Sequence, residues 1–132
     1  MRDTPRPAPT GDLDTPDAIA EMAGDVEYVR RLVIDTALRL GELHFVSGRC
    51  DRAVTWAERV RSASPYDERA HRLAVAAHLQ RGDRLAAARA VAATRTMLAE
   101  LAADPEPATE MLLRQAESRA GNLVLTPARS GR

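Results

Sequence analysis

The sequence predicts an all-α fold built from repeated helix pairs, and two observations lead to this prediction. Hydrophobic residues recur at helical spacing and are mostly Ala, Leu and Val, with one Trp, one Phe and two Tyr among 132 residues. Two segments share the order helix, Gly, charged link and Ala-rich helix; Gly48 and Gly82 are 34 residues apart, as are His44 and His78. This is the period of the tetratricopeptide (TPR) unit, so we expect a TPR-like α-solenoid of about five to six helices.

The N-terminal part predicts a disordered leader over residues 1–14, which are rich in proline, followed by two helices. Thr15 before Pro16 is a helix start, because Thr accepts a hydrogen bond at the cap and Pro fits the first position. Gly24 is expected to end this short helix, and Asp25 to cap a long one that stops at Gly48. The apolar stripe expected on the long helix is Val26, Val29, Leu32, Val33, Ala37, Leu40, Leu43 and His44.

The central part predicts three further helix starts. Asp51 is expected to cap one helix, and Asp83 another. Between them Ser64 is expected as a cap with Pro65 at the first helical position and Asp67 completing a capping box. The expected core residues of these helices are Ala53, Val54, Ala57, Val60, Ala70, Leu73, Ala74, Ala77, Ala87, Val91, Thr94, Leu98 and Leu101.

Two prolines within residues 104–107 cannot continue a helix, so a break is expected there. A last helix is predicted over 109–119, ended by Gly121, with a flexible tail over 120–132. The folded domain is therefore expected to span 15–119. Because about three repeats are needed for stability, the helices at 25–47 and 109–119 are expected to act as caps or half-repeats.

Composition restricts the location and the class of partner. The formal net charge is zero, which argues against a chain that binds nucleic acid through its phosphates, so no direct DNA binding is expected from this chain alone. The chain has no long apolar run and no signal-peptide core, so neither a membrane span nor secretion is expected. Cys50 is the only cysteine, which is typical of a reducing cytoplasm.

No catalytic, metal or cofactor site is predicted. The sequence contains no nucleophile motif, no phosphate-binding glycine loop and no carboxylate pair that can be placed at one site. The three histidines and the single cysteine lack the spacing of a zinc site. We therefore expect a protein that is not an enzyme.

The candidate site is the concave face of the predicted solenoid, where the first helix of each TPR-like unit lies. Arg69 and Arg72 are three residues apart on one helix, which places their side chains near each other. Such a groove suits an acidic or amphipathic peptide; the alternative is that both arginines are solvated or pair with Asp67 and Glu68. The full predicted set of partner-binding residues is Asp35, Leu38, Glu42, Phe45, Arg69 and Arg72.

Three segments resemble a known family: PYDERAHR at 65–72, the Gly-Asp turn at 82–83, and LAELAADPEPAT at 98–109. Together they resemble the bacterial transcriptional activator domain, the helical module that follows a winged helix in antibiotic-regulatory activators of actinobacteria. The resemblance covers about residues 25–118. One departure is Ala102, where the family commonly has Gly. Residues 1–24 are too short to hold the winged helix of these activators.

The resemblance implies a TPR-like module that works in transcriptional regulation through protein contacts. The expected partner is a transcription regulator, RNA polymerase or a second copy of the chain, so that a homodimer is one option. The alternative function is a generic TPR-like adaptor unrelated to transcription.

Overall fold

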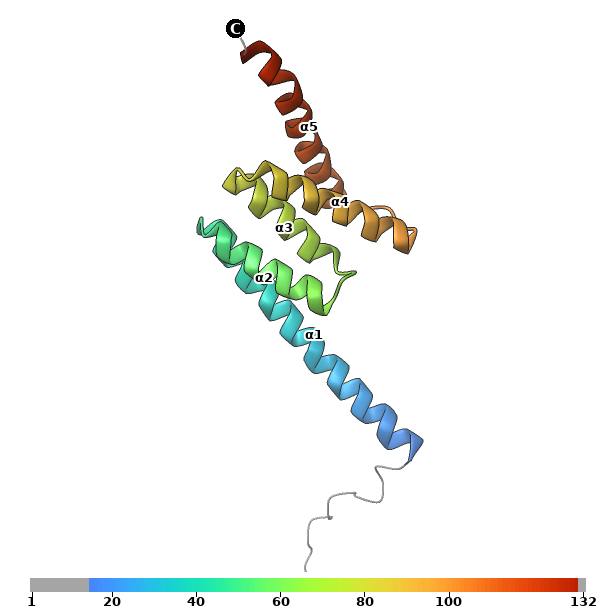
Figure 1. The fold of residues 1–132 in the computed structure, drawn as a ribbon. Helices are drawn as coiled ribbons and strands as arrows, with labels where there is room; N and C mark the ends of the chain where they lie inside the picture. Colours follow the sequence, from blue (N-terminus) through green and yellow to red (C-terminus); the bar gives the residue numbers. More distant parts are fainter. Residues whose placement is uncertain (1–14, 131–132) are drawn as a thin grey trace, which may run out of the picture. The chain divides into compact units, whose positions relative to one another are not determined.

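The computed structural model describes residues 15–130, with side chains described for 15–120. Regular structure in this part of the chain is entirely helical (Figure 1). This confirms the all-α class. The predicted leader over residues 1–14 lies outside the described residues. The helices are α1 (Pro16–Val46), α2 (Cys50–Ala63), α3 (Glu68–Arg81), α4 (Arg84–Leu101) and α5 (Pro107–Ser130).

The chain forms two units, Met1–Asp35 and Thr36–Arg132, and α1 contributes residues to both. In the first unit Thr15 caps α1, its Oγ1 accepting a hydrogen bond from the Ala18 N–H at 3.1 Å, as predicted. Gly24 lies inside α1, so the predicted break between two helices at Gly24 and Asp25 is wrong. A helical Gly costs only about 1 kcal/mol, and extending a helix is easier than nucleating a new one.

In the second unit α2 packs against α3, α3 packs against α4, and α5 packs against both α3 and α4. Consecutive helices run antiparallel, as short links require (Figure 1). The core of this unit is built from small side chains, which lets the helix backbones approach closely. Its fully buried members are Ala53, Ala57, Ala70, Ala74, Val75, Ala77 and Leu113, each 0 % exposed.

Gly41 lies where α1 packs closely against α2 and α3. A Cβ atom added to Gly41 would lie 2.6 Å from Cδ2 of Leu73 and 3.1 Å from Cβ of Trp56. Both distances are shorter than ordinary van der Waals contact. A glycine is therefore needed here for packing, although its backbone is helical.

The two glycines that define the repeat have the same conformation. Gly48 and Gly82 both have φ of 82°, a left-handed geometry that ends a helix at little cost for glycine. Asp83 then caps α4, because its carboxylate accepts a hydrogen bond from the Ala86 N–H at 3.1 Å. Thirty-four residues earlier the cap of α2 is Arg49, which makes no side-chain cap bond. The repeat is thus confirmed in backbone geometry but not in capping chemistry.

Two predicted caps are wrong. Asp51 lies in the first turn of α2 instead of at its cap, and its carboxylate pairs with Arg81 at the end of α3. Ser64 is the C-cap of α2, with its N–H donating to the Val60 carbonyl at 2.6 Å. Asp67 caps α3 by accepting a hydrogen bond from the Arg69 N–H at 3.0 Å. Helix α3 therefore begins at Glu68 and not at Pro65.

The C-terminal helix is longer than predicted. The break at the two prolines is confirmed, since α4 ends at Leu101 and α5 begins at Pro107, a position that suits proline. However, α5 continues through Gly121 to Ser130, so the predicted helix end at Gly121 is wrong. The flexibility expected for residues 120–132 stays a prediction.

Ala102 ends α4 with φ of 51° and ψ of 42°, and among the described non-glycine residues it alone has a positive φ. An L-residue pays about 1 kcal/mol for this conformation, which glycine adopts freely. We expect Ala102→Gly to raise the free energy of unfolding by about 1 kcal/mol in urea denaturation. Ala103→Gly is the control and should give no gain, since Ala103 has a negative φ. Equal effects of the two substitutions would contradict this explanation.

Candidate partner-binding surface

Arg72, one of the predicted site residues, ties α3 to the start of α5. Its Nη1 donates to Oε1 of Glu106 at 2.8 Å and to Oγ1 of Thr109 at 2.9 Å. In return, the backbone N–H of Glu106 donates to Oε2 of Glu68 at 2.7 Å. We call Glu68, Arg72, Glu106 and Thr109 the α3–α5 clamp. Its members come from the PYDERAHR and LAELAADPEPAT segments, so two of the segments that carry the family resemblance bind each other.

Because Arg72 holds the α3–α5 clamp together, we expect its removal to destabilise the fold. Thr109 is 1 % exposed, so removing the guanidinium leaves a buried hydroxyl without this donor. We expect Arg72→Ala to lower the free energy of unfolding by about 2 kcal/mol, measured by urea denaturation. Arg69→Ala is the matched control, with an expected loss below about 1 kcal/mol because its ion pair is exposed. If the two variants lost the same stability, the clamp would not matter for folding.

Arg69 forms an ion pair with Asp67, two residues before it in the chain. Its Nε and Nη2 donate to the two carboxylate oxygens of Asp67 at 3.0 and 2.7 Å. Burial raises the pKa of Asp67, but the hydrogen bonds and the positive charge from Arg69 outweigh it and leave that pKa below its ordinary value. Half-exposed Arg69 thus faces solvent with its guanidinium oriented by Asp67. The alternative of intramolecular pairing is confirmed for Arg69 with Asp67, whereas Arg72 pairs with Glu106 and not with Glu68.

The remaining predicted site residues differ in how accessible they are to a partner. Leu38 is 2 % exposed and belongs to the core, so it is not available to a partner. Glu42 is exposed and lies 3.8 Å from the guanidinium of Arg39, while Phe45 is half-buried. Asp35 is exposed and belongs to the first unit. A partner contact through the accessible members of this set stays a prediction.

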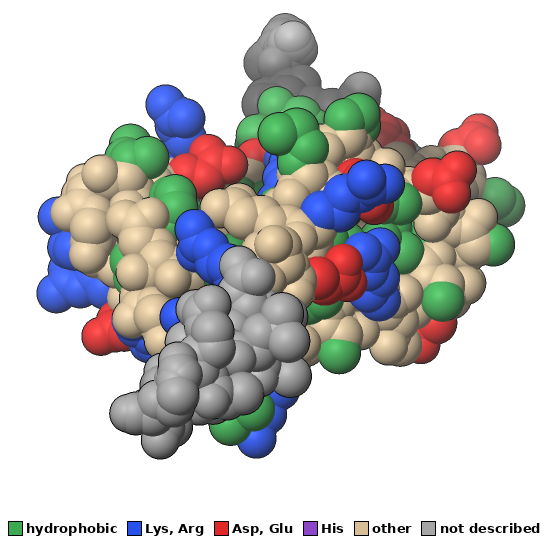
Figure 2. Space-filling model, turned by 90° about the horizontal axis from the view of Figure 1, so that it is seen from above, with side chains coloured by type: hydrophobic (Ala, Val, Ile, Leu, Met, Phe, Trp, Pro, Cys, Tyr) green, Lys and Arg blue, Asp and Glu red, His purple; other side chains and the backbone are tan. Residues whose placement is uncertain are grey.

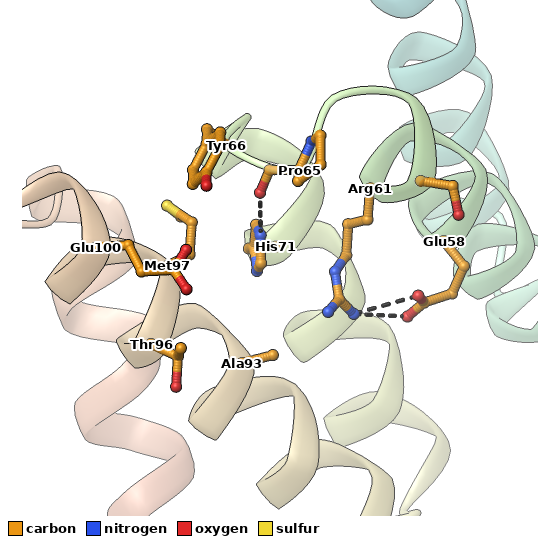
Figure 3. A pocket seen from close by; sticks show the side chains of 10 residues that line it. Glu58, Arg61, Pro65, Tyr66, His71, Ala93, Thr96, Met97 and Glu100 are labelled. Carbon is orange, nitrogen blue, oxygen red and sulfur yellow. Dashed lines mark hydrogen bonds and ion pairs between the residues drawn. The ribbon is translucent and has the colours of Figure 1, made fainter.

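A hollow that the sequence did not indicate lies between α2, the α2–α3 link, α3 and α4 (Figure 3). Its volume is about 410 Å³, and it is open to solvent. The ring of Tyr66, which is 54 % exposed, and the carboxylate of Glu100 lie on the same side of it, next to the buried Met97. On the opposite side Arg61 donates to the carboxylate of Glu58 at 2.9 Å. The sequence signal that could have indicated this hollow is a tyrosine directly after Pro65, at the boundary between two predicted helices.

His71 forms the fixed floor of the hollow. The ring is 4 % exposed, and its Nε2 donates to the carbonyl of Pro65 at 2.9 Å. Its Nδ1 lies 3.3 Å from Oγ1 of Thr94, which donates to the Ala90 carbonyl at 2.8 Å. Both ring nitrogens therefore lie against polar groups of the protein. The histidine joins the α2–α3 link to α4 and shapes the hollow instead of presenting a base to a ligand.

The other two histidines lie at equivalent ends of α1 and α3. Arg49 donates to Nδ1 of His44 at 2.9 Å, and Arg81 lies 3.3 Å from Nδ1 of His78. Burial and then the neighbouring arginine charges lower the pKa of both histidines. Each neutral ring thus accepts an arginine N–H close to the glycine turn of its repeat.

The described residues contain no group of three His, Cys, Asp or Glu side chains that could hold a metal ion. Over the same residues, no helix combines the length and the apolar character that crossing a bilayer requires. Arginine and acidic side chains lie beside one another on the face drawn in Figure 2. Ion pairs of the second unit include Arg95 with Glu117 and Arg61 with Glu58.

The helical repeat and its internal clamp define this chain as a TPR-like all-α repeat domain. Residues 11–116 match the family model of the bacterial transcriptional activator domain. Because this match covers most of the 132 residues, the chain belongs to that family. No curated protein and no solved structure matches the chain significantly. The resemblance inferred from the motifs is thereby confirmed, and with it a domain type related to transcriptional activators.

Proposed function

We propose that this chain is a non-enzymatic protein–protein interaction module that acts in transcriptional regulation in the cytoplasm. The observation that carries the proposal is the family match over residues 11–116, on a helical repeat of a kind that presents surfaces to proteins. The partner is a DNA-bound regulator, RNA polymerase or a second copy of the chain. Paired charges such as Arg95 with Glu117 favour a protein partner over a phosphate backbone.

The accessible members of the predicted face support a contact with a partner of mixed charge. Glu42 and Arg69 are exposed, and Asp67 holds the guanidinium of Arg69 in place, which lowers the entropy lost on binding. The hollow beside Tyr66 offers a second anchor point, where an aromatic ring and the carboxylate of Glu100 are both accessible. Arg72 is not part of the proposed contact, because it holds α3 and α5 together.

The experiment is a pull-down of the tagged chain from lysate of its own cells, with bound proteins identified by mass spectrometry. Three forms are compared: the wild type, Glu42→Arg/Arg69→Glu, and Tyr66→Ala/Glu100→Ala. Circular dichroism checks that each variant is folded. Recovery of a DNA-binding regulator or polymerase subunits by the wild type, and its loss with one variant, supports the proposal and identifies the face used.

The generic adaptor is the second candidate function. It predicts recovery of partners unrelated to transcription, and no polymerase or regulator in any of the three samples. That result would contradict the proposed role in transcription while leaving the helical-repeat fold unaffected.

A further inference from the structure

The first unit carries a row of large hydrophobic side chains that lie exposed on α1. Their exposed fractions are between 49 and 67 %. Among the described residues 15–35 of this unit, α1 is the only element, and no side chain of residues 15–33 is buried. We call Ile19, Met22, Val26, Val29 and Val33 the α1 seam.

The spacing of the α1 seam is that of a coiled coil. Its residues alternate steps of three and four, which places Ile19, Val26 and Val33 at heptad position a and the other two at position d. Leu32, which is 47 % exposed, lies beside this row at position g. All three a positions are β-branched, as in parallel two-stranded coiled coils, while the d positions hold Met22 and Val29.

The charges beside the seam are complementary to a second copy of the same helix. Asp25 lies at position g and Arg30 at position e of the following heptad. In a parallel pair, position g of one helix faces position e five residues later on the other, so Asp25 of each copy would meet Arg30 of the other. Glu27, at position b and away from the seam, lies 4.0 Å from Arg31 at position f and also 4.0 Å from Arg30. Asp25 and Arg30 thus fit the same heptad register as the apolar residues of the α1 seam.

We propose that the α1 seam binds the same seam of a second copy of this chain, as a parallel, in-register two-stranded coiled coil. This inference deepens the proposed function, because it names one partner and the surface that takes it. The seam spans only about two heptads, so the dimer is expected to dissociate on dilution.

The first test measures association of the full chain by sedimentation velocity over a range of concentrations. The wild type should show a concentration-dependent dimer, and Val26→Glu/Val29→Glu should weaken it at least about tenfold, because charges would enter the seam. Tyr28→Glu is the matched control: Tyr28 is 61 % exposed on the same helix but lies at position c, so this variant should dimerise normally. A wild type that stays monomeric, or a dimer unaffected by the seam substitutions, would overturn the proposal.

Charge reversal and cross-linking test the register. Asp25→Arg should weaken the dimer, and Asp25→Arg/Arg30→Asp should restore it, since the swapped charges again face each other. In a Cys50→Ala background, Val26→Cys should form a disulfide-linked dimer under mild oxidation faster than Tyr28→Cys. Absence of both rescue and preferential cross-linking would overturn the parallel arrangement. Failure of these tests, with a regulator still recovered in the pull-down, would leave the proposed function intact.

Discussion

Gly41→Val is expected to lower the free energy of unfolding by about 3 kcal/mol. The first added carbon would lie 2.6 Å from Leu73 and 3.1 Å from Cβ of Trp56, and valine adds two further methyl groups. The Leu73 side chain is 7 % exposed and has little room to move, and the Trp56 contact is to an atom attached directly to the backbone. The helices must therefore separate locally, which is how overpacking destabilises a close-packed core.

The measurement is urea denaturation followed by circular dichroism, with Gly24→Val as the control. Gly24 also lies inside α1, but an added Cβ there meets nothing within 4 Å. Valine at position 24 should be neutral or slightly stabilising, since valine has a higher helix propensity than glycine. Similar effects at the two positions would show that packing at Gly41 does not limit the stability.

His71→Ala is expected to destabilise the fold by about 3 kcal/mol. The substitution removes a ring that is 4 % exposed and leaves the Pro65 carbonyl without its donor at 2.9 Å. The void would open directly under the hollow lined by Tyr66 and Met97. We therefore expect both a loss of stability and a change in the shape of the hollow.

Thermal and urea unfolding of His71→Ala should be compared with His44→Ala. His44 is half-exposed, and its ring accepts one hydrogen bond from the Arg49 side chain, so its removal should cost less than about 1 kcal/mol. If His71→Ala were no more destabilising than His44→Ala, the bond to Pro65 would have no structural role. If Tyr66 contributes to partner binding, His71→Ala should also weaken that binding while the protein remains folded.

Several features that depend on local sequence were predicted correctly. Gly48 and Gly82 end their helices in the left-handed conformation, Asp83 and Thr15 cap helices, and the prolines at 105 and 107 separate the last two helices. In each case the residue type itself favours a backbone conformation or offers a nearby acceptor. The buried alanines of α2 and α3 were predicted for the same reason, since helical periodicity is also local, but Leu101, which was expected in the core, is 47 % exposed.

Other features depended on contacts between segments far apart in the chain. Asp51 could have capped a helix, but in the folded chain it pairs with Arg81, which is 30 residues away. The sequence predicts that Arg72 lies on the concave face of the solenoid, yet α5 brings Glu106 and Thr109 within hydrogen-bond distance of it. Neither outcome could be predicted from spacing, because an arginine looks the same in the sequence whether it meets a partner or another helix of its own chain.

By itself, the sequence of this protein determined its helical class, its 34-residue repeat and its family, because periodicity, glycine turns and short motifs are local properties. Tertiary structure alone decided that Leu38 is buried, that Arg72 belongs to the α3–α5 clamp, and that a hollow opens beside Tyr66. Those outcomes follow from how closely the helices approach, which is set by side-chain volumes at contacts such as Gly41 with Leu73.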